Sequence, residues 1–309
     1  MSHKLSIIMP AFGLAKHKVL FSNAIKGIID QTYNNWELII VCDGNNDNTK
    51  TIIASELGKY DDPRIKPFVY LQGEAGPGVI RNYGFARAKG KYITFHDSDD
   101  FSEPTRFEKL IQVLNSGKDI VASNVLINFV DEPNQNRIKQ YSGENFNIFV
   151  EQRKVKPPMH MSSAIMTYEL FQKMGGFESY KFSSDSIFVI KLGLFRGIKG
   201  TEPIPMIKEP LFVWNRQPHS ITTLQSNSYI LKKCISAQRK PLKREVRDRI
   251  ISKQIHSGLP DKELRAQLII VNNLTDIKNK LVEIHSNKAR KCMLPKVVKS
   301  LKDKKSIKG

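Results

Sequence analysis

Three carboxylates within four positions of this chain could bind a divalent cation. Asp97, Asp99 and Asp100 follow directly on a short apolar run, and carboxylates this close repel one another unless a cation or hydrogen-bond donors compensate their charge. Mg²⁺ and Mn²⁺ prefer one or two carboxylates, with water and substrate phosphate oxygens in the remaining positions. Acidic turns and helix caps show the same pattern, so the position of the cluster in the fold decides between the two interpretations.

Two further side chains are of types that bind nucleotides. Asp43 ends an apolar run and could accept a hydrogen bond from a base imide or a ribose hydroxyl, although an aspartate before Gly44 is equally typical of a turn. Arg81 follows a glycine-containing loop and could face a diphosphate, although a single arginine on a helix is more often solvated. For each residue by itself, both interpretations stay open.

These residues lie among apolar runs that alternate with helical patterns. The runs predict strands at residues 4–9, 36–42, 67–71 and 92–96. Pro10 is expected to end the first strand. Apolar residues at three- and four-residue intervals predict a helix at residues 18–30. Asp47 or Asn48 could cap a second helix that runs to about Leu57, and residues 79–88 also have a helical pattern. Such alternation implies right-handed crossovers and an α/β fold, with a mainly parallel sheet covered by helices on both faces.

Polar residues directly follow three of the predicted strands. They are Pro10-Ala11, Asp43-Gly44 and the acidic cluster Asp97–Asp100. Because parallel sheets bind ligands beyond the carboxyl ends of their strands, we expect these residues to meet at one edge. Just beyond the cluster, Ser102-Glu103-Pro104 predicts a helix start with a serine cap. This placement favours a cation site over an ordinary acidic turn.

The pattern continues less regularly in the second half of the chain. Strands are predicted at residues 119–130 and 159–166, with a long loop at 131–158 between them. Helices are predicted at residues 168–174 and 184–195. From residue 226 onward the pattern is helical and strongly basic.

Composition limits the class of protein. A chain of 309 residues with 40% hydrophobic content can bury a full α/β core. No stretch reaches the roughly 18 apolar residues of a membrane span, and the N-terminus lacks a signal-peptide pattern, so a cytoplasmic location is expected. The scattered cysteines Cys42, Cys234 and Cys292 indicate neither a disulfide framework nor a zinc site.

The basic charge is concentrated near the C-terminus. Residues 225–309 contain 22 lysines and arginines against 7 aspartates and glutamates, whereas residues 1–224 are nearly neutral. We therefore predict a catalytic domain at 1–224 and a basic helical extension at 225–309. Such an extension could contact an anionic partner, either nucleic acid or a membrane surface, or it could simply be a solvated helical face.

The order of these motifs resembles that of the family 2 glycosyltransferases of the GT-A fold. The segments that carry the resemblance lie within residues 4–222 and are Leu5-Ser-Ile-Ile-Met-Pro-Ala-Phe12, Gln31-Thr-Tyr33, Glu37-Leu-Ile-Ile-Val-Cys-Asp-Gly44, Gly78-Val-Ile-Arg-Asn-Tyr-Gly84, Gly90-Lys-Tyr-Ile-Thr-Phe-His-Asp-Ser-Asp-Asp100, Gly175-Gly-Phe-Glu178, Ser184-Asp185 and Trp214-Asn-Arg216-Gln-Pro-His219-Ser-Ile-Thr222. The resemblance implies a nucleotide-binding, mostly parallel sheet and an inverting transferase that uses a nucleotide-sugar donor with Mn²⁺ or Mg²⁺.

The resemblance also implies a role for individual residues. Asp43 would contact the nucleobase, Arg81 the base or diphosphate, and Asp97 the ribose. Asp185 would be the general base that takes the proton of the acceptor hydroxyl; without the family context it is more simply a helix cap. The implied nucleotide-sugar contacts are Pro10, Ala11, Asp43, Arg81, Asp97 and Ser98. The implied metal ligands are Asp99 and His219, and Arg216 and His160 are further candidates for diphosphate or acceptor contacts.

Three positions depart from the usual family pattern. Cys42 replaces an aspartate, Gly13 an asparagine, and Ser184-Asp185 a Glu-Asp pair. These changes leave the core chemistry intact but leave the donor open, with UDP-sugars the commonest in the family.

The acceptor separates the remaining hypotheses. A surface glycan or lipid-linked saccharide is favoured by family frequency, whereas the basic extension would also suit a phage-type enzyme that glycosylates hydroxylated DNA bases after flipping them out of the duplex. A nucleotidyltransferase would need a glycine-arginine phosphate loop after the first strand, which Gly13-Leu-Ala-Lys16 does not form. The joint presence of the candidate site residues argues against a non-catalytic nucleic-acid-binding protein.

Overall fold

The computed structural model describes residues 3–44, 48–71, 75–144, 158–177, 184–185, 188–189, 192–193, 196 and 202–217. All of them belong to one compact unit. The predicted boundary at 224/225, the basic extension and His219 lie outside the described residues. Among the helices of the described ranges, none has the length and hydropathy needed to cross a membrane.

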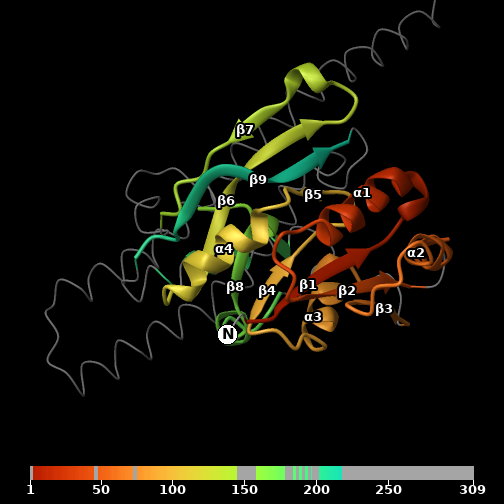
Figure 1. Cartoon of the computed structure of the whole chain (residues 1–309), viewed down its shortest axis with the longest axis horizontal. Coiled ribbons are helices and arrows are strands. Elements are labelled where there is room, and N and C mark those ends of the chain that lie inside the picture. Colours follow the sequence, from red (N-terminus) through yellow and green to blue (C-terminus); the bar gives the residue numbers. More distant parts are fainter. Residues whose placement is uncertain are drawn as a thin grey trace, which may run out of the picture. The chain divides into compact units, whose positions relative to one another are not determined.

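Strands and helices alternate through the first half of the chain, as the sequence pattern predicts (Figure 1). The strands are β1 (Leu5–Ala11), β2 (Trp36–Asp43), β3 (Ile65–Tyr70), β4 (Tyr92–Phe95), β5 (Phe101–Ser102), β6 (Ile120–Phe129), β7 (Arg137–Lys139), β8 (Ala164–Thr167) and β9 (Met206–Arg216). The α-helices are α1 (Lys18–Ile29), α2 (Thr49–Leu57), α3 (Pro77–Phe85), α4 (Arg106–Asn115) and α6 (Tyr168–Lys173). The short 3₁₀ turns are η1 (Leu14–Lys16), η2 (Pro133–Gln135) and η3 (Met161–Ser163).

The strands form one mixed sheet in the order β3-β2-β1-β4-β8-β6-β9-β5, with β7 paired to β6. β3, β2, β1 and β4 are parallel to one another. β8 is antiparallel to both β4 and β6, and β9 is parallel to β6, so β6 and β9 run in the direction of β4. Most strands therefore share one direction, and the predicted mostly parallel α/β sheet is confirmed.

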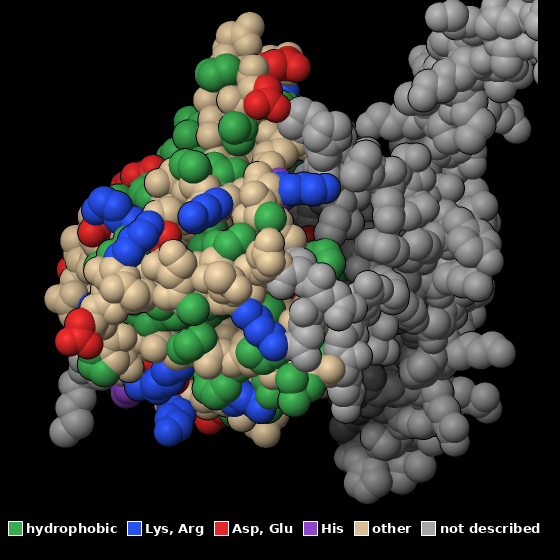
Figure 2. All heavy atoms as spheres, turned by 90° about the vertical axis from the view of Figure 1, so that its right-hand side faces the viewer, with side chains coloured by type: hydrophobic (Ala, Val, Ile, Leu, Met, Phe, Trp, Pro, Cys, Tyr) green, Lys and Arg blue, Asp and Glu red, His purple; other side chains and the backbone are tan. Residues whose placement is uncertain are grey.

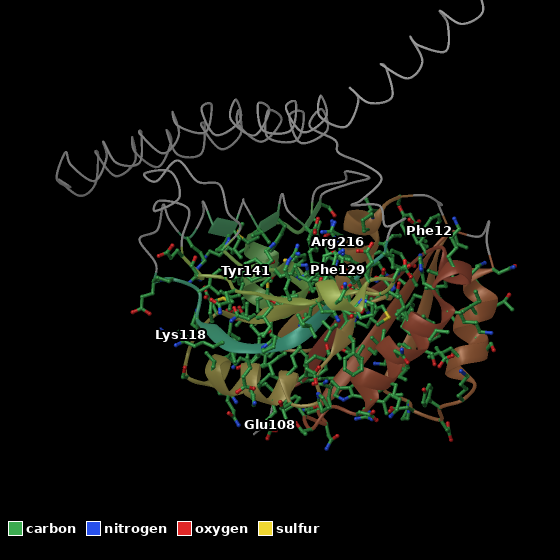
Figure 3. All side chains as sticks on the ribbon, turned by 90° about the horizontal axis from the view of Figure 1, so that it is seen from above. Phe12, Glu108, Lys118, Phe129, Tyr141 and Arg216 are labelled. Carbon is green, nitrogen blue, oxygen red and sulfur yellow. The ribbon has the colours of Figure 1, made fainter. Side chains whose placement is uncertain are left out.

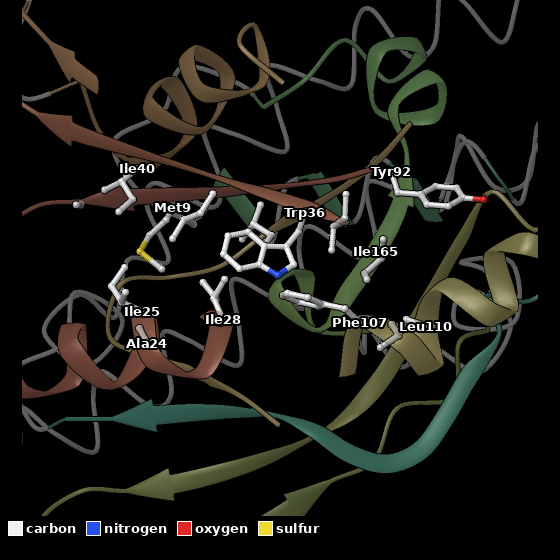
Figure 4. Packing of buried hydrophobic residues seen from close by; sticks show 14 of the residues in the cluster. Met9, Ala24, Ile25, Ile28, Trp36, Ile40, Tyr92, Phe107, Leu110 and Ile165 are labelled. Carbon is white, nitrogen blue, oxygen red and sulfur yellow. The ribbon is translucent and has the colours of Figure 1, made fainter. Parts of the chain in front are cut away.

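Helices cover both faces of the parallel half. Leu38 and Ile40 of β2 belong to the core cluster that includes the buried face of α1, whereas Ile39 and Val41 pack with Ile80 of α3. Alternate side chains of a strand point to opposite faces of the sheet. Because helices cover both faces here, every residue of β2 is buried. This explains why β2 reads as a continuous apolar run. Figure 4 shows aliphatic side chains of α1 and α4 packed on one face of the sheet.

Pro10 does not end β1 as predicted. Proline has no N–H to donate, but at this position of β1 the backbone N–H would point toward β4, which no longer pairs with β1 there. The N–H of Leu5 donates toward β2, so the even-numbered residues of β1 face β4. β4 pairs with β1 only as far as Ile8, whereas β1 stays paired with β2 through Ala11. A proline at position 10 therefore interrupts no hydrogen bond of the sheet.

The predicted helix start at Ser102 is also wrong. Phe101 and Ser102 form β5, which pairs with β9, and α4 begins at Arg106. The Ser102 hydroxyl is used elsewhere, since it lies 2.7 Å from a guanidinium nitrogen of Arg106 and 3.0 Å from Nε2 of His96. It therefore caps no helix.

Two later predictions differ in their bounds. Part of the predicted loop at 131–158 forms η2 and the short strand β7. The strand predicted from Met159 begins only at Ala164, because residues 161–163 form η3, in which the Ser163 N–H donates to the His160 carbonyl.

Glu37 of β2 is fully buried, and charged and polar groups compensate its carboxylate. It accepts hydrogen bonds from the Ser6 hydroxyl (2.8 Å), the Lys66 ammonium (2.7 Å) and the Lys89 N–H (2.8 Å), and Lys4 Nζ lies 3.4 Å away. Burial by itself raises the pKa of Glu37, but these partners bring it from 4.5 down to about 2. An acid with a lowered pKa stabilises the fold above its unfolded pKa, and this stabilisation disappears as the pH falls toward the folded value.

Glu37→Gln is therefore expected to lower the free energy of unfolding at neutral pH by about 2 to 4 kcal/mol, since the amide turns an N–H group toward the ammonium groups of Lys66 and Lys4. The difference from wild type should shrink as the pH falls from about 4.5 toward about 2. Urea denaturation followed by circular dichroism at neutral and acidic pH measures both effects. Glu209→Gln, which removes only a surface ion pair with Lys109, is the control and should change stability little. A pH-independent loss for Glu37→Gln would contradict the assignment.

Candidate active site at the carboxyl edge of the sheet

Asp43 ends β2 at the carboxyl edge of the parallel strands and holds the loop that leads into α3. Its side chain is almost fully buried, and its two oxygens accept hydrogen bonds from the N–H groups of Ala75 (3.2 Å) and Gly76 (3.1 Å). The end of β1 lies alongside, with Ala11 paired to Cys42 and Pro10 to Val41. The first two predicted groups of site residues therefore share one edge.

Arg81 and Asp97 join α3 to the turn after β4. Arg81 is 5% exposed, and its guanidinium forms an ion pair and hydrogen bond with the Asp97 carboxylate, above the ring of Phe177. Burial by itself raises the pKa of Asp97, but the charge and hydrogen bond of Arg81 hold it below its ordinary value. Asp97 is therefore ionised at neutral pH, and its side chain is still 31% exposed. An exposed, ionised carboxylate can accept hydrogen bonds from a ligand.

Asp97 has two further contacts that fix its position. The Ser162 hydroxyl lies 3.4 Å from its second carboxylate oxygen, and Nδ1 of His96 lies 2.8 Å from its backbone carbonyl. His96 is fully buried, and burial together with the charge of Arg106 lowers its pKa to about 4, so the ring is neutral at physiological pH.

The end of β9 holds the other two carboxylates of the acidic cluster. The Asn215 N–H donates to the Asp100 carboxylate (2.9 Å), and its side-chain amide donates to the Asp99 carbonyl (2.6 Å). The Gln217 amide lies 3.4 Å from the Asp99 carboxylate. Burial and the charge of Asp97 raise the pKa of Asp99 to about 7, while burial and both neighbouring carboxylates raise that of Asp100 well above its ordinary value. The surroundings thus compensate a negative charge on Asp99 or Asp100 poorly, whereas Arg81 compensates that of Asp97.

This donor set fits a hard divalent cation. Burial and the charge of Asp97 raise the pKa of Asp99, and a cation would stabilise its ionised form and find carboxylate oxygens, the ligands that Mg²⁺ and Mn²⁺ prefer. In the part of the chain that the structure describes, no group of three or more His, Cys, Asp or Glu side chains could hold a metal ion by itself. One or two carboxylates supplemented by substrate phosphates and water are a common arrangement for Mg²⁺. His219, the second predicted ligand, lies outside the described residues.

Asp185 acts electrostatically on the same region. Burial lowers the pKa of Arg81, but the charges of Asp97 and then Asp185 overcome this effect and raise it. Burial lowers the pKa of His160 to about 4, against the opposing charges of Asp185 and Asp97. Burial raises the pKa of Tyr141, and Asp185 adds to the increase. The predicted base and the predicted donor site therefore belong to one electrostatic neighbourhood.

His160 and Arg216 both lie against Trp214. The His160 ring is 5.3 Å from the Trp214 ring, and the Arg216 guanidinium is 5.2 Å from it. Arg216 ends β9 beside Phe129, at 5.7 Å from that ring (Figure 3). Tyr141 also borders His160, with ring centroids 6.5 Å apart. His160 and Arg216, the two candidate contacts, thus lie beside the same aromatic side chain, Trp214.

Several residues that organise the site were not identified from the sequence. Ser162 and His96 contact Asp97, and Asn215 and Gln217 contact the next two aspartates. Asn215 and Gln217 lie inside the segment Trp214–Thr222 that carries part of the family resemblance, and His96 directly precedes the acidic cluster, so proximity to a motif could have indicated them. Ser162 carries no comparable signal, since it is 65 positions from Asp97.

Comparison with known proteins shows which family the chain resembles. Residues 6–175, more than half of the chain, match the family model described as Glycosyl transferase family 2. Over 141 residues the chain is 36% identical to the GalNAc(5)-diNAcBac-PP-undecaprenol beta-1,3-glucosyltransferase of Campylobacter jejuni. That alignment covers 46% of this chain and 43% of the relative, so the matched part spans less than half of the relative's length.

Solved structures share the fold at low sequence identity. S. aureus TarS 1–349 in complex with UDP-GlcNAc is 15% identical and covers 88% of this chain and 71% of its own, with a TM-score of 0.63. The mannosyltransferase PcManGT from Pyrobaculum calidifontis, in complex with GDP-Man and Mn²⁺, is 14% identical and covers 94% of this chain and 76% of its own, with a TM-score of 0.56. These similarities confirm the predicted α/β fold of the GT-A type.

Proposed function

The chain belongs to glycosyl transferase family 2, and from this premise we propose that it is an inverting enzyme that moves a sugar from a UDP-sugar to an acceptor hydroxyl. The observation that carries the proposal is the contact between Arg81 and Asp97, which joins α3 to the acidic turn. The charge of Asp185 acts on the same arginine. Because Asp97 and Asp185 both act on Arg81, these observations support a donor site beside a general base.

In the proposed complex, the donor nucleotide lies along the carboxyl ends of β1, β2 and β4. Asp43 contacts the nucleobase and Asp97 the ribose hydroxyls, while Pro10-Ala11 and Ser98 line the same edge. Arg81 keeps Asp97 ionised and contributes positive charge near the diphosphate. The complex of TarS with UDP-GlcNAc supports a UDP-sugar as the donor.

Asp99 and His219 are the proposed ligands of Mn²⁺ or Mg²⁺. The fit rests on the poorly compensated carboxylate of Asp99, whose pKa burial and Asp97 raise to about 7, and the Mn²⁺ complex of PcManGT supports it. When bound, such a cation stabilises the negative charge on the departing diphosphate.

Asp185 is the proposed general base. It takes the proton of the acceptor hydroxyl while that oxygen forms a bond to the anomeric carbon and the bond from this carbon to the diphosphate oxygen breaks. Attack from the face opposite the diphosphate inverts the anomeric configuration. His160 and Arg216 are proposed to contact the diphosphate or the acceptor. Because its pKa is about 4, His160 is neutral at physiological pH and contributes hydrogen bonds rather than charge.

We propose a surface glycan or lipid-linked saccharide as the acceptor. The Campylobacter jejuni relative is named for an undecaprenol-linked saccharide, which supports an acceptor of this class. In the proposed domain arrangement, residues 1–224 catalyse transfer and the basic residues 225–309 contact an anionic membrane surface.

A DNA acceptor is the second candidate, and the concentration of positive charge in residues 225–309 is the observation that favours it. On the face shown in Figure 2, basic and acidic side chains of the described residues are interspersed. A polyanion contact is therefore proposed for the extension, where the positive charge is concentrated, rather than for this face of the catalytic domain.

A mass-spectrometric transfer assay tests donor and acceptor together. The full chain is incubated with Mn²⁺, a panel of nucleotide sugars, and either lipid-linked saccharides or hydroxymethylated duplex DNA. We expect transfer from a UDP-sugar to a saccharide acceptor. Transfer to the DNA alone would replace the glycan proposal by the DNA one, and transfer from another nucleotide sugar alone would reject UDP.

A further inference from the structure

Arg106, the first residue of α4, is a buried arginine to which neither the family match nor the proposed chemistry assigns a role. It is 0% exposed, and burial lowers its pKa to about 9. Within the described residues its hydrogen bonds go to the Ser102 hydroxyl (2.7 Å), the Thr94 hydroxyl (3.0 Å) and the Ser162 carbonyl, none of which is a carboxylate. The charge of Asp100 opposes this lowering of the pKa, but a guanidinium buried without a hydrogen bond to a carboxylate is still unfavourable. The contacts of this group therefore point to a specific use.

One path of hydrogen bonds leads from Arg106 to the backbone of the acidic turn. Because the arginine can only donate, Ser102 Oγ must accept from it, and the Ser102 hydroxyl is then free to donate to Nε2 of His96 at 3.0 Å. The Asp97 carbonyl can only accept, so Nδ1 of His96, at 2.8 Å, carries the proton. Every donor in this path thus meets an acceptor, and the neutral His96 is fixed in the Nδ1–H tautomer.

A second path leads to the Asp97 side chain. Arg106 donates to the Ser162 carbonyl, and the Ser162 hydroxyl lies 3.4 Å from the Asp97 carboxylate. A third contact anchors the arginine to the sheet, since it donates to the Thr94 hydroxyl, which in turn donates to the Ala164 carbonyl at 2.7 Å. Arg106 therefore connects β4, β5 and η3, the elements next to the turn that carries Asp97.

We propose that Arg106 is a positioning residue that sets the place of Asp97 for donor binding, through Ser102 and His96 on one side and Ser162 on the other. The effect on donor binding rests on the proposed function, because that function assigns Asp97 to the ribose. The hydrogen-bond path itself does not depend on it. Arg106 reaches these three acceptors from two separate guanidinium nitrogens, whereas a lysine would have to reach all of them from a single nitrogen, so lysine is not an equivalent replacement.

The first experiment tests the path without any substrate. Long-range ¹⁵N–¹H NMR of histidine-labelled full-length protein, with the His96 signals assigned by a His96→Gln variant, reports which ring nitrogen carries the proton. We expect a neutral ring in the Nδ1–H tautomer. An Nε2–H tautomer would overturn the path, whatever the activity of the enzyme.

The second experiment measures donor affinity and kinetics. Arg106→Met is expected to weaken UDP-sugar binding in Mn²⁺ by about 10- to 100-fold, by analogy with the loss of groups that orient metal-ligating side chains, and Arg106→Lys should recover only part of it. The matched control is Arg196→Met, because Arg196 is also buried but pairs with Asp119, the residue just before β6. It should lose thermal stability too, yet bind the donor within about twofold of wild type. The donor KM should follow the affinity in each variant.

Equal donor affinity of the Arg106→Met and Arg196→Met variants, measured well below both unfolding midpoints, would refute the positioning role. If Arg106→Met does not fold, Ser102→Ala interrupts the first path with a small change and should weaken donor binding about fivefold. A wild-type chain that binds no nucleoside diphosphate would instead refute the proposed function, and the NMR result would still decide whether the path exists.

Discussion

Asp185→Asn is expected to bind the donor normally but to transfer sugar at least about 100-fold more slowly than wild type. General-base catalysis by a positioned side chain contributes about 10²- to 10⁴-fold, and an amide cannot accept the proton of the acceptor hydroxyl. The charge of Asp185 acts on Arg81, His160 and Tyr141. In the proposed function Asp185 contacts the acceptor hydroxyl and not the donor, and the loss of a negative charge does not weaken the binding of an anionic diphosphate. Donor affinity should therefore not fall.

Single-turnover transfer and calorimetric donor binding separate these two effects. Asp61→Asn, at an exposed position away from the acidic cluster, is the control and should match wild type in both measurements. Normal turnover of Asp185→Asn would remove Asp185 as the base. A parallel loss of donor binding and transfer would instead make it a donor contact.

The sheet and its main helices could be predicted because their signals are local. β2 was expected at 36–42 and spans Trp36–Asp43, and α1 was expected at 18–30 and spans Lys18–Ile29. A strand buried on both faces reads as an apolar run, and a helix packed on one face reads as a one-sided pattern. The convergence of strand ends at one edge then follows from the topology of a parallel sheet.

The contacts within the site could not be predicted in the same way, because they join distant segments. Asn215 reaches Asp100 across 115 positions, and Ser162 reaches Asp97 across 65. β9 was not predicted as a strand, since its pairing with β6 is broken by register shifts near Asn124 and its sequence does not alternate regularly. The start of α4 was placed too early, because the Ser102 hydroxyl serves a tertiary network rather than a cap.

Asp99→Asn is expected to abolish metal-dependent binding of a nucleoside diphosphate, with a loss of about 100-fold or more in affinity in Mn²⁺, while the fold is retained. An amide oxygen is a weaker ligand than a carboxylate and brings no charge to the cation. The carboxylate of Asp99 lies 3.4 Å from the Gln217 amide, and an asparagine oxygen can keep that contact. Calorimetric titration of UDP with Mn²⁺ and with EDTA measures the effect, and unchanged affinity in Mn²⁺ would reject the assignment.

The thermal stability of Asp99→Asn provides an independent test, because the variant should keep or gain stability while it loses metal-dependent binding. The folded pKa of Asp99 is raised from 3.8 to about 7, first by burial and then by the charge of Asp97, so without metal its ionisation destabilises the fold increasingly as the pH rises through this range. At mildly alkaline pH, Asp99→Asn should therefore unfold at the same or a higher temperature than metal-free wild type. Mn²⁺ with UDP should raise the midpoint of wild type but not that of the variant, because only a ligand bound to the native state stabilises it. A variant that loses stability as well as binding would indicate a structural role for Asp99 instead of a metal ligand.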